Sequence, residues 1–403
     1  MIVRNDTRDR ALTGFDNIEK RLVRLMERDR YRRRRVVESP QGRELIVDGR
    51  RLLNFCSNDY LGLAADERIS SACKMAVDRW GVGSGASHLV TGHTGAHHEL
   101  EIALAEFTGR PRALLFSSGY MANVGVINAL LSKPDCVYED RLNHASLLDG
   151  GWISRAAFSW YAHGDMQSLD EALSAGDGSG RALIVSDGTF SMDGDRCPLA
   201  DMLPVARKHG AWIMIDDAHG LGVHGPGGRG LVDPDRYSCA DVPVLMGTLG
   251  KAFGTFGAFV AGDEALIETL IQRSRNYIFT TALPSAIAAA TLISLQIVQD
   301  EQWRRDHLDA MIARFRAGAA DIGLELSMSG SPIQPIIVGD AGQAVALSRA
   351  LEAQGVLITA IRPPTVPEGT SRLRLTITAA HTEADIDRLL QALAEVMRGV
   401  SRD

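Results

Sequence analysis

The chain has 403 residues, of which 45% are hydrophobic and 23% charged, and its formal net charge is −7 at pH 7. This length predicts a large domain with smaller parts attached, and the composition is typical of a soluble globular protein. The negative charge disfavours nucleic acid as a general partner, and because no run of about twenty apolar residues occurs, we expect no membrane span.

The start of the chain and its cysteines both indicate a cytoplasmic protein. The first residues lack the apolar core of a secretory signal. The five cysteines are scattered and never form a C-x-x-C pair, so we expect reduced thiols and neither a disulfide framework nor a zinc site.

Residues 1–60 are expected to form an N-terminal arm with a short hairpin-like segment. They contain the basic run "RDRYRRRR" at 28–35. Its commonest interpretation is a solvated arm, and binding of nucleic acid is a second one. A third interpretation, an arm that binds an anionic substrate, stays open.

Residues 61–300 are expected to form the large domain. Short β-rich runs alternate there with helical segments, which predicts a mainly parallel seven-stranded sheet covered on both faces. The segment 286–298 is predicted to be a buried helix that starts behind Pro284. The strands are expected at 112–118, 135–140, 157–162, 181–187, 211–217, 242–248 and 257–262.

Residues 301–403 are expected to form a smaller α+β domain. The pattern there starts with a long helix and ends with an amphipathic one, and short β-rich runs lie between them. The helices are expected at 301–322, 341–354 and 383–399, and the strands at 333–339, 356–361 and 372–378.

Polar side chains gather at the predicted strand ends, where ligands of such sheets bind. "SSGYMAN" follows the first strand, "RLNHASLLDG" the second, "SDGTFSMDGD" the fourth, "IMIDDAHG" overlaps the end of the fifth, and "MGTLGKAFG" that of the sixth. Each motif has an ordinary structural explanation by itself, such as a helix cap or a turn. Their recurrence at one edge of the sheet favours a shared ligand.

Lys251 in "MGTLGKAFG" has three possible roles. A phosphate-binding loop is excluded because Gly247 and Gly250 are too close together and Ala252 follows the lysine. "GVGSGASH" at 81–88 does not complete a dinucleotide-binding fingerprint either. The remaining roles are an ordinary surface lysine or a buried amine used in covalent catalysis.

One ligand suits these motifs together. Pyridoxal phosphate needs a lysine for its aldehyde, a carboxylate for its pyridine nitrogen, donors for its phenolic oxygen and a helix N-terminus for its phosphate. In that order the chain offers Lys251, Asp216, the pair His219 and Ser191, and the turn Gly119–Tyr120.

Five stretches also resemble one enzyme family: "NFCSNDYLGL", "SHLVTGHTGAHHELE", "FSMDGD", "IDDAHGLGVHGPGGRG" and "TLGKAFG". They resemble the α-oxoamine synthases, which are pyridoxal-phosphate enzymes of fold type I, and the likeness extends over about residues 20–395. Within that family, residues 359–381 most resemble the branch that condenses L-alanine with a pimeloyl thioester in biotin biosynthesis. The resemblance therefore implies an acyltransferase that releases CO2 and the thiol carrier, and a homodimer with active sites at the subunit interface.

The resemblance also implies a role for each matching residue. Lys251 would hold the cofactor and remove the α-proton of alanine, and Asp216 would face the ring nitrogen. His144 would stack on the ring and contact substrate, while His219 and Ser191 would lie near the phenolic oxygen. The phosphate would be bound by Gly119, Tyr120 and Thr248, with Thr280 and Thr281 of the neighbouring subunit, and substrate by Asn58, Thr365 and Arg374.

Two positions match the family less directly. Counting back from Asn58 places the family's N-terminal substrate arginine on Arg32, with Arg30 and Arg33 to Arg35 beside it as alternatives. Asp187 stands where related enzymes often carry glutamate, and its shorter side chain is expected to loosen a contact near the cofactor.

Three other activities and one metal site are alternatives to this interpretation. Relatives with the same chemistry use glycine with acetyl- or succinyl-coenzyme A, an aminotransferase of the same fold consumes no thioester, and a nucleic-acid binder would use the arginine run. The sequence does not distinguish coenzyme A from a carrier protein as the acyl carrier. "HHELE" at 97–101 is not a zinc motif, so we expect no metal at His93, His97 or His98.

Overall fold

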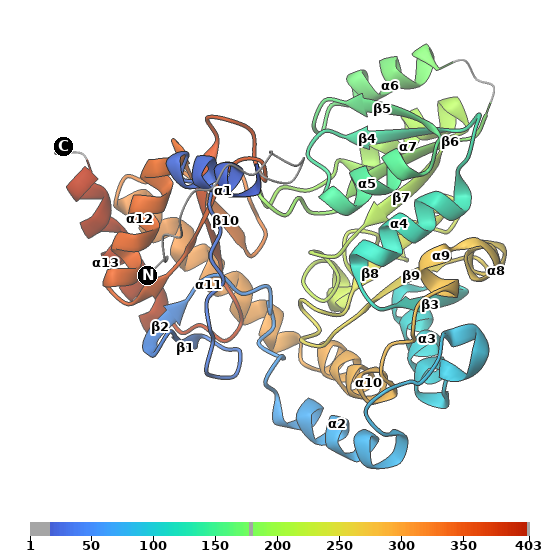
Figure 1. Ribbon diagram of the computed structural model, residues 1–403, viewed down its shortest axis with the longest axis horizontal. Helices are drawn as coiled ribbons and strands as arrows, with labels where there is room; N and C mark the ends of the chain where they lie inside the picture. Colours follow the sequence, from blue (N-terminus) through green and yellow to red (C-terminus); the bar gives the residue numbers. More distant parts are fainter. Residues whose placement is uncertain (1–16, 177–179, 401–403) are drawn as a thin grey trace, which may run out of the picture.

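The computed structural model describes residues 17–176 and 180–400. Figure 1 shows two parts side by side: a sheet with its covering helices, and a smaller group of strands and helices from the two ends of the chain. The long helices α10 (Ser285–Asp300) and α11 (Gln302–Asp321) follow one another where the two parts meet.

The large sheet has seven strands in the order β3-β9-β8-β7-β6-β4-β5. Only β9 runs antiparallel to its neighbours, so the prediction of a mainly parallel seven-stranded sheet is confirmed. The strands are β3 (Arg112–Phe116), β4 (Cys136–Asp140), β5 (Ala157–Tyr161), β6 (Ala182–Asp187), β7 (Trp212–Asp216), β8 (Val244–Thr248) and β9 (Ala258–Gly262).

The central strands are apolar throughout because helices cover both faces of the sheet. Met214 of β7 packs in the cluster with α4 (Gly119–Leu130) and α8 (Glu264–Arg273). Its neighbours Ile213 and Ile215 pack in the cluster on the other face, with α6 (Met166–Ala175) and α7 (Leu199–His209). This two-residue alternation is what a sheet buried on both faces requires.

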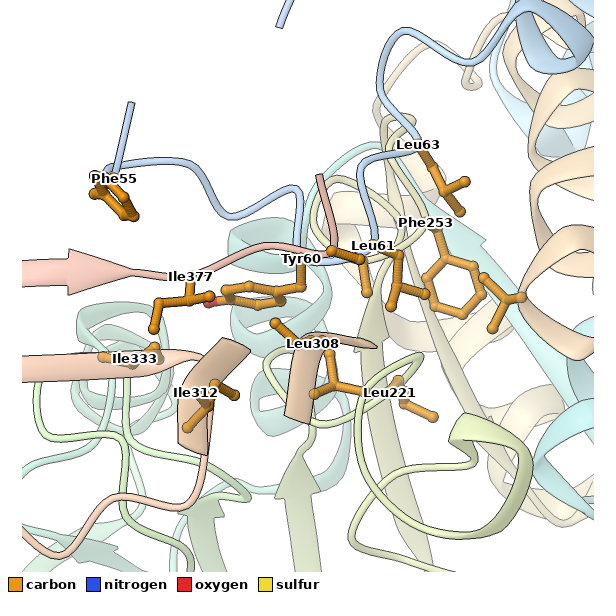
Figure 2. Packing of buried hydrophobic residues seen from close by; sticks show 14 of the residues in the cluster. Phe55, Tyr60, Leu61, Leu63, Leu221, Phe253, Leu308, Ile312, Ile333 and Ile377 are labelled. Carbon is orange, nitrogen blue, oxygen red and sulfur yellow. The ribbon is translucent and has the colours of Figure 1, made fainter. Parts of the chain in front are cut away.

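A third cluster joins the two parts of the molecule. Figure 2 shows Tyr60, Leu61 and Leu63 packed between Phe253 and Leu221 of the large part and Leu308, Ile333 and Ile377 of the C-terminal part. Further along it, α10 packs on α2 (Glu67–Trp80) and α3 (Gly95–Thr108). The predicted buried helix near 286–298 is therefore present as α10.

The smaller part combines both ends of the chain. Strands β10 (Ile333–Gly339), β13 (Ser371–Thr376) and β12 (Thr359–Ile361) form an antiparallel sheet, covered by α11, α12 (Ala341–Ala353) and α13 (Glu383–Val400). The N-terminal hairpin of β1 (Glu44–Val47) and β2 (Arg50–Asn54) forms a second sheet with β11 (Val356–Leu357).

The expected strand at 356–361 is therefore two strands in two sheets, β11 and β12. The β11–β2 pairing also ties the N-terminal segment to the C-terminal part, as the neighbouring blue and orange ribbons of Figure 1 show. The domain boundaries at residues 60 and 300 stay a prediction. The remaining described helices with more than three residues are α1 (Ile18–Glu27), α5 (Ala145–Ile153), α9 (Arg275–Ile278) and a π-helical turn (His88–Gly92).

None of the helices in the described ranges combines the length and the apolar character needed to cross a lipid bilayer.

Candidate active site

Four neighbouring strands bring polar residues to one edge of the large sheet. β6 ends at Asp187, β7 at Asp216 and β8 at Thr248, while His144 lies in the turn after β4. Because these strands are adjacent and parallel, their carboxyl ends lie side by side. They enclose a cavity of about 180 Å³ lined by Gly119, Tyr120, Asn123, His144, Ser146, Asp187, Asp216, Ala218, His219, Met246, Thr248 and Lys251.

Lys251 reaches this cavity from the turn that follows β8. Its Nζ lies 2.8 Å from Nε2 of His219. Burial lowers the pKa of the amine to about 8, and the nearby carboxylates of Asp216 and Asp187 oppose that shift. A substantial fraction of Lys251 is therefore neutral near pH 7–8, which suits a nucleophile or a base and not a surface lysine.

His219 is buried and held from both ring nitrogens. Burial, then Lys251 and Arg374, lowers its pKa well below the usual value, so the ring is neutral. Its Nδ1 lies 2.7 Å from the hydroxyl of Tyr60, and that hydroxyl lies 3.2 Å from Oδ1 of Asn58. One set of protons satisfies every contact: Lys251 donates to Nε2, Nδ1–H donates to Tyr60, and Tyr60 donates to Asn58.

Asp216 also lines the cavity and is fixed there by two donors. Its Oδ1 accepts the N–H of Ala218 (3.0 Å), and its Oδ2 accepts Nδ2 of Asn123 (2.7 Å). Asn123 is fully buried on α4 and also donates to the hydroxyl of Ser146 (2.9 Å). The sequence analysis missed this supporting residue, for which an asparagine within the apolar helix pattern at 120–131 is the sequence signal.

His144 caps α5 and presents its ring to open space in the cavity. Its Nδ1 lies 2.7 Å from Oγ of Ser146, and its backbone N–H donates to Oδ2 of Asp187 (2.7 Å). Asp187 is buried, and this burial and the charge of Asp216 raise its pKa well above the usual value. Asp187 thus makes a close contact with the backbone of His144, and its expected effect on a contact near the cofactor stays a prediction.

A second cavity of about 310 Å³ continues from the first. Both are lined by His144, His219 and Lys251, and the second also by Asn58, Ser191 and Arg374. Arg374 lies on β13 of the smaller part, and its Nε donates to the carbonyl of Ser191 (2.6 Å) while Nη2 donates to Oδ1 of Asn58 (3.2 Å). The cavity therefore lies between the two parts of the molecule.

The start of α4 also lines the first cavity. Gly119 and Tyr120 form the first turn of this helix, whose leading N–H groups have no partners within the helix. The positive end of the helix dipole adds to these donors and favours an anion there. Thr248 stands nearby, with its hydroxyl bonded to the carbonyl of Gly257 (3.1 Å).

Four of the predicted site residues lie away from Lys251. Thr280 and Thr281 line none of the described cavities near the site. Nη2 of Arg32 donates to Oγ1 of Thr365 (3.0 Å), which joins the N-terminal arm to the wall of a third cavity. Arg30 and Arg35 of the basic run also pair with the C-terminal part, through Glu368 and Glu352.

The histidines near residue 93 form a separate cluster. His93, His98 and Glu101 gather their ligand atoms within 4.8 Å, although sequence spacing did not indicate such a group. Glu101 already accepts the N–H of Leu115 (3.0 Å), and Nδ1 of His93 contacts His88 (3.1 Å). His97 instead contacts the carbonyl of Leu283. That no metal binds here stays a prediction.

The sequence matches one family along most of its length. The family model for class I and II aminotransferases matches residues 50–393. The 8-amino-7-oxononanoate synthase of Nitrosococcus oceani is 62% identical over 367 residues, which cover 91% of this chain and 97% of that protein. The protein of the same name from Pseudomonas putida is 58% identical and covers 95% and 97% of the two chains.

Solved structures agree with this match. The serine palmitoyltransferase of Sphingomonas wittichii superposes with a TM-score of 0.90 at 32% identity, covering 98% of this chain and 99% of that one. A serine palmitoyltransferase variant from S. paucimobilis, solved with bound PLP–myriocin, has a TM-score of 0.90 at 30% identity and covers 96% and 98%. The 8-amino-7-oxononanoate synthase of Francisella tularensis has a TM-score of 0.76 at 31% identity and covers 87% and 99%.

Proposed function

The chain belongs to the class I and II aminotransferase family and, within it, to the 8-amino-7-oxononanoate synthases, and from this premise we propose what its site does. The site joins L-alanine to a pimeloyl thioester, with loss of CO2 and release of the thiol carrier, to form 8-amino-7-oxononanoate for biotin biosynthesis. The observation that carries the proposal is the buried pair of Lys251 and His219 facing Asp216 in one cavity.

The residues present fit pyridoxal phosphate, the cofactor of this family. An amine with a pKa of about 8, a carboxylate held by Asn123 and the first turn of α4 line a single cavity. When bound, the cofactor supplies an aldehyde for the amine and a ring that accepts the electron pair left on the α-carbon of the amino acid. Lys251 would hold the aldehyde, Asp216 the ring nitrogen, and Gly119, Tyr120 and Thr248 the phosphate.

Lys251 has a second task once its amine is free. Its Nζ removes the α-proton of L-alanine and later returns a proton to the product. Both transfers need an amine that gains and loses a proton near neutral pH, and the lowered pKa of Lys251 provides it. The neutral His219 accepts a hydrogen bond from Nζ and keeps this amine directed into the cavity.

Asp216 keeps a negative charge where a protonated ring nitrogen needs one. The N–H of Ala218 and the amide of Asn123 stabilise the ionised carboxylate and fix its orientation. His219 and Ser191 would contact the phenolic oxygen of the cofactor. His144, held at its backbone by Asp187, would present its ring to the cofactor and the substrate.

The two substrates would bind on the side of the smaller part. Arg374 and Asn58 line the second cavity, and a guanidinium there suits the carboxylate of L-alanine. Thr365 and the Arg32 bonded to it lie further out, and we assign them to the acyl donor.

We also propose that two copies of the chain share their sites in the cytoplasm. The side chains of Val82, Leu89, Val90 and Phe279 are exposed although apolar. The segments that carry them are joined by a hydrogen bond from Ala282 to Ala86 (3.0 Å), so they offer a common apolar face. Covering this face would bring Thr280 and Thr281 of one subunit to the phosphate of the other.

The test is an assay of the purified chain loaded with pyridoxal phosphate. Pimeloyl-coenzyme A is offered with L-alanine, glycine or L-serine, and product masses and the visible absorbance of the cofactor are recorded. We expect the mass of 8-amino-7-oxononanoate with L-alanine alone. Product only from glycine or serine with another acyl thioester would keep the chemistry and refute the substrate assignment, and a missing cofactor band would refute the role of Lys251.

A further inference from the structure

A third cavity, of about 930 Å³, extends the site beyond His144. It shares His144, Ser191 and Met192 with the second cavity, so the two are continuous. Much of its wall is apolar and comes from three segments: the start of α5, the turn after β6 and the loop before β13. The apolar residues are Leu142, Ala145, Leu148, Phe190, Met192, Pro363, Pro364, Val366 and Pro367.

Three arginines also line this cavity, and two of them are committed to other groups. Arg372 is buried, pairs with Asp193 (2.5 Å) and donates to the carbonyls of Met192 and Thr370. Arg30 pairs with Glu368. Within residues 17–176 and 180–400, the exposed side chain of Arg141 has neither a hydrogen bond nor an ion pair. Arg141 is thus a cation that faces a largely apolar cavity with its donors unused.

The backbone around Arg141 is fixed although its side chain is free. Its N–H donates to the carbonyl of Tyr161 (3.2 Å), and the N–H of Leu142 donates to Oδ1 of Asp140 (2.8 Å). Three residues later, His144 lines all three cavities. The Cα atoms of Arg141 and His144 are therefore at most about 11 Å apart. The backbone of Arg141 is therefore held close to His144, and its free guanidinium lines the same cavity.

A pimeloyl group is long enough to extend from the reacting centre into this cavity. Six carbon–carbon bonds of about 1.5 Å separate the thioester carbon of a pimeloyl group from its far carboxylate, or roughly 8 Å in extended form. Five methylene groups lie between, and they need an apolar wall. A carboxylate at the far end needs a cation, and a guanidinium binds it with two parallel hydrogen bonds.

We propose that Arg141 binds the terminal carboxylate of the acyl donor and thereby selects a dicarboxylic acyl chain over a plain fatty one. The methylene groups of the acyl donor lie along the apolar wall formed by Leu142, Leu148 and Val366. This inference rests on the proposed function. It adds Arg141 as the residue that recognises the far end of the acyl group, while Arg374 binds the amino acid. The phosphates of a coenzyme A carrier are the other candidate anions for Arg141, and the test separates them from the acyl carboxylate.

The test compares two acyl donors of equal length in the holoenzyme with L-alanine. Pimeloyl-coenzyme A carries the far carboxylate, and heptanoyl-coenzyme A has a methyl group in its place. We expect Arg141→Met to lower kcat/KM for pimeloyl-coenzyme A by about 10- to 100-fold, mainly through KM, because one charge-assisted pair is lost. The value for heptanoyl-coenzyme A should stay within about twofold, and equal losses with both donors would overturn the proposal.

Two further variants make the result secure. Arg207→Met is the matched control, because Arg207 is an exposed arginine on α7 that pairs with Asp241 away from the cavities. This variant should leave kcat/KM unchanged for both acyl donors. Arg141→Lys keeps the charge and loses the paired donors, so it should give a smaller loss confined to pimeloyl-coenzyme A. It also carries the test if Arg141→Met fails to fold.

A binding measurement separates this inference from the proposed function. Calorimetric titration of the holoenzyme with each donor, without amino acid, should give a lower Kd for pimeloyl- than for heptanoyl-coenzyme A, and Arg141→Met should remove the difference. That result with no turnover would refute the proposed reaction and retain the subsite. Equal Kd values for the two donors in the unmodified chain would refute the subsite whatever the turnover.

Discussion

Within residues 17–176 and 180–400, both ends of the large sheet carry cavities, and a reactive cluster lies at one of them. At the amino ends of β4, β6 and β7 lies a cavity of about 520 Å³, lined at those strands by Cys136, Ala182 and Trp212. At the carboxyl ends of the same strands the cavity that holds Lys251 is smaller, about 180 Å³. The cavity that holds Lys251 is thus the smaller of these two, although the cavity continuous with it beyond His144 reaches about 930 Å³, and its chemistry and not its size distinguishes it.

The two ends of the sheet differ in which ionisable groups they bury and in how burial shifts the pKa values of those groups. The carboxyl end brings Asp187, Asp216 and Lys251 together, and burial shifts the pKa values of Asp187 and Lys251 toward their neutral forms. At the amino end Asp135 is buried as well, but it pairs with the exposed Arg181, which lowers the pKa of the carboxyl and keeps it ionised. Burial that shifts an amine and a carboxyl toward their neutral forms is costly, so the cluster at the carboxyl end indicates a function there.

The largest expected effect comes from removing the amine. Lys251→Ala should lower turnover by at least about 1000-fold, since a positioned base alone contributes 10²- to 10⁴-fold. The unfolding temperature should change little, because the variant removes a buried amine and no apolar packing. Steady-state product formation and thermal unfolding measure both effects. Lys208→Ala, at an exposed lysine paired with Asp170, is the control and should retain full activity.

A smaller effect is expected from neutralising one carboxylate. Asp216→Asn should lower kcat by about 100-fold, because a preorganised charge at the cofactor ring is lost while the shape is kept. Asp217→Asn makes the same change one residue later, where the side chain accepts the N–H of Leu231 instead (2.6 Å). If both variants lose activity equally, the charge of Asp216 has no special role.

The third expected effect is a pH dependence of the rate at which Lys251 captures the cofactor. The pKa of Lys251 is about 8 in the folded chain and 10.5 for a free side chain. Only the neutral amine attacks an aldehyde, so the rate of covalent cofactor capture by the cofactor-free chain should rise about tenfold per pH unit up to pH 8 and then level off. Stopped-flow absorbance measures this rate. A midpoint near 10.5 would show that burial does not tune the amine.

The smallest effect on activity is expected at the other end of the sheet. Leu173→Ala removes an apolar side chain from the amino-end cavity and should lower the free energy of unfolding by about 2–4 kcal/mol. The kcat of the folded protein should not change. Denaturant unfolding and an assay corrected for folded protein separate these quantities, and a large loss of kcat would mean that the two ends are coupled.

Much of the fold could be predicted because it depends on local patterns. Apolar runs such as those of β7 and β8 end in polar residues, and the alternation of strands with helices restricts the sheet to a mainly parallel one. The strand at 356–361 could not be predicted correctly, because its division between two sheets depends on β2, about 300 residues earlier in the chain. Such a pairing leaves no local signal.

The sequence by itself determined which chemical groups the site has. Lys251, Asp216 and His219 stand just after apolar strands or at their ends, and parallel strands must bring those ends to one edge. Tertiary structure alone decided how the groups are held. Tyr60 reaches His219 from the N-terminal segment, Asn123 reaches Asp216 from α4, and Arg374 enters from the smaller part. These contacts join residues 93–316 positions apart, and only packing of distant segments creates the burial that shifts the pKa of Lys251.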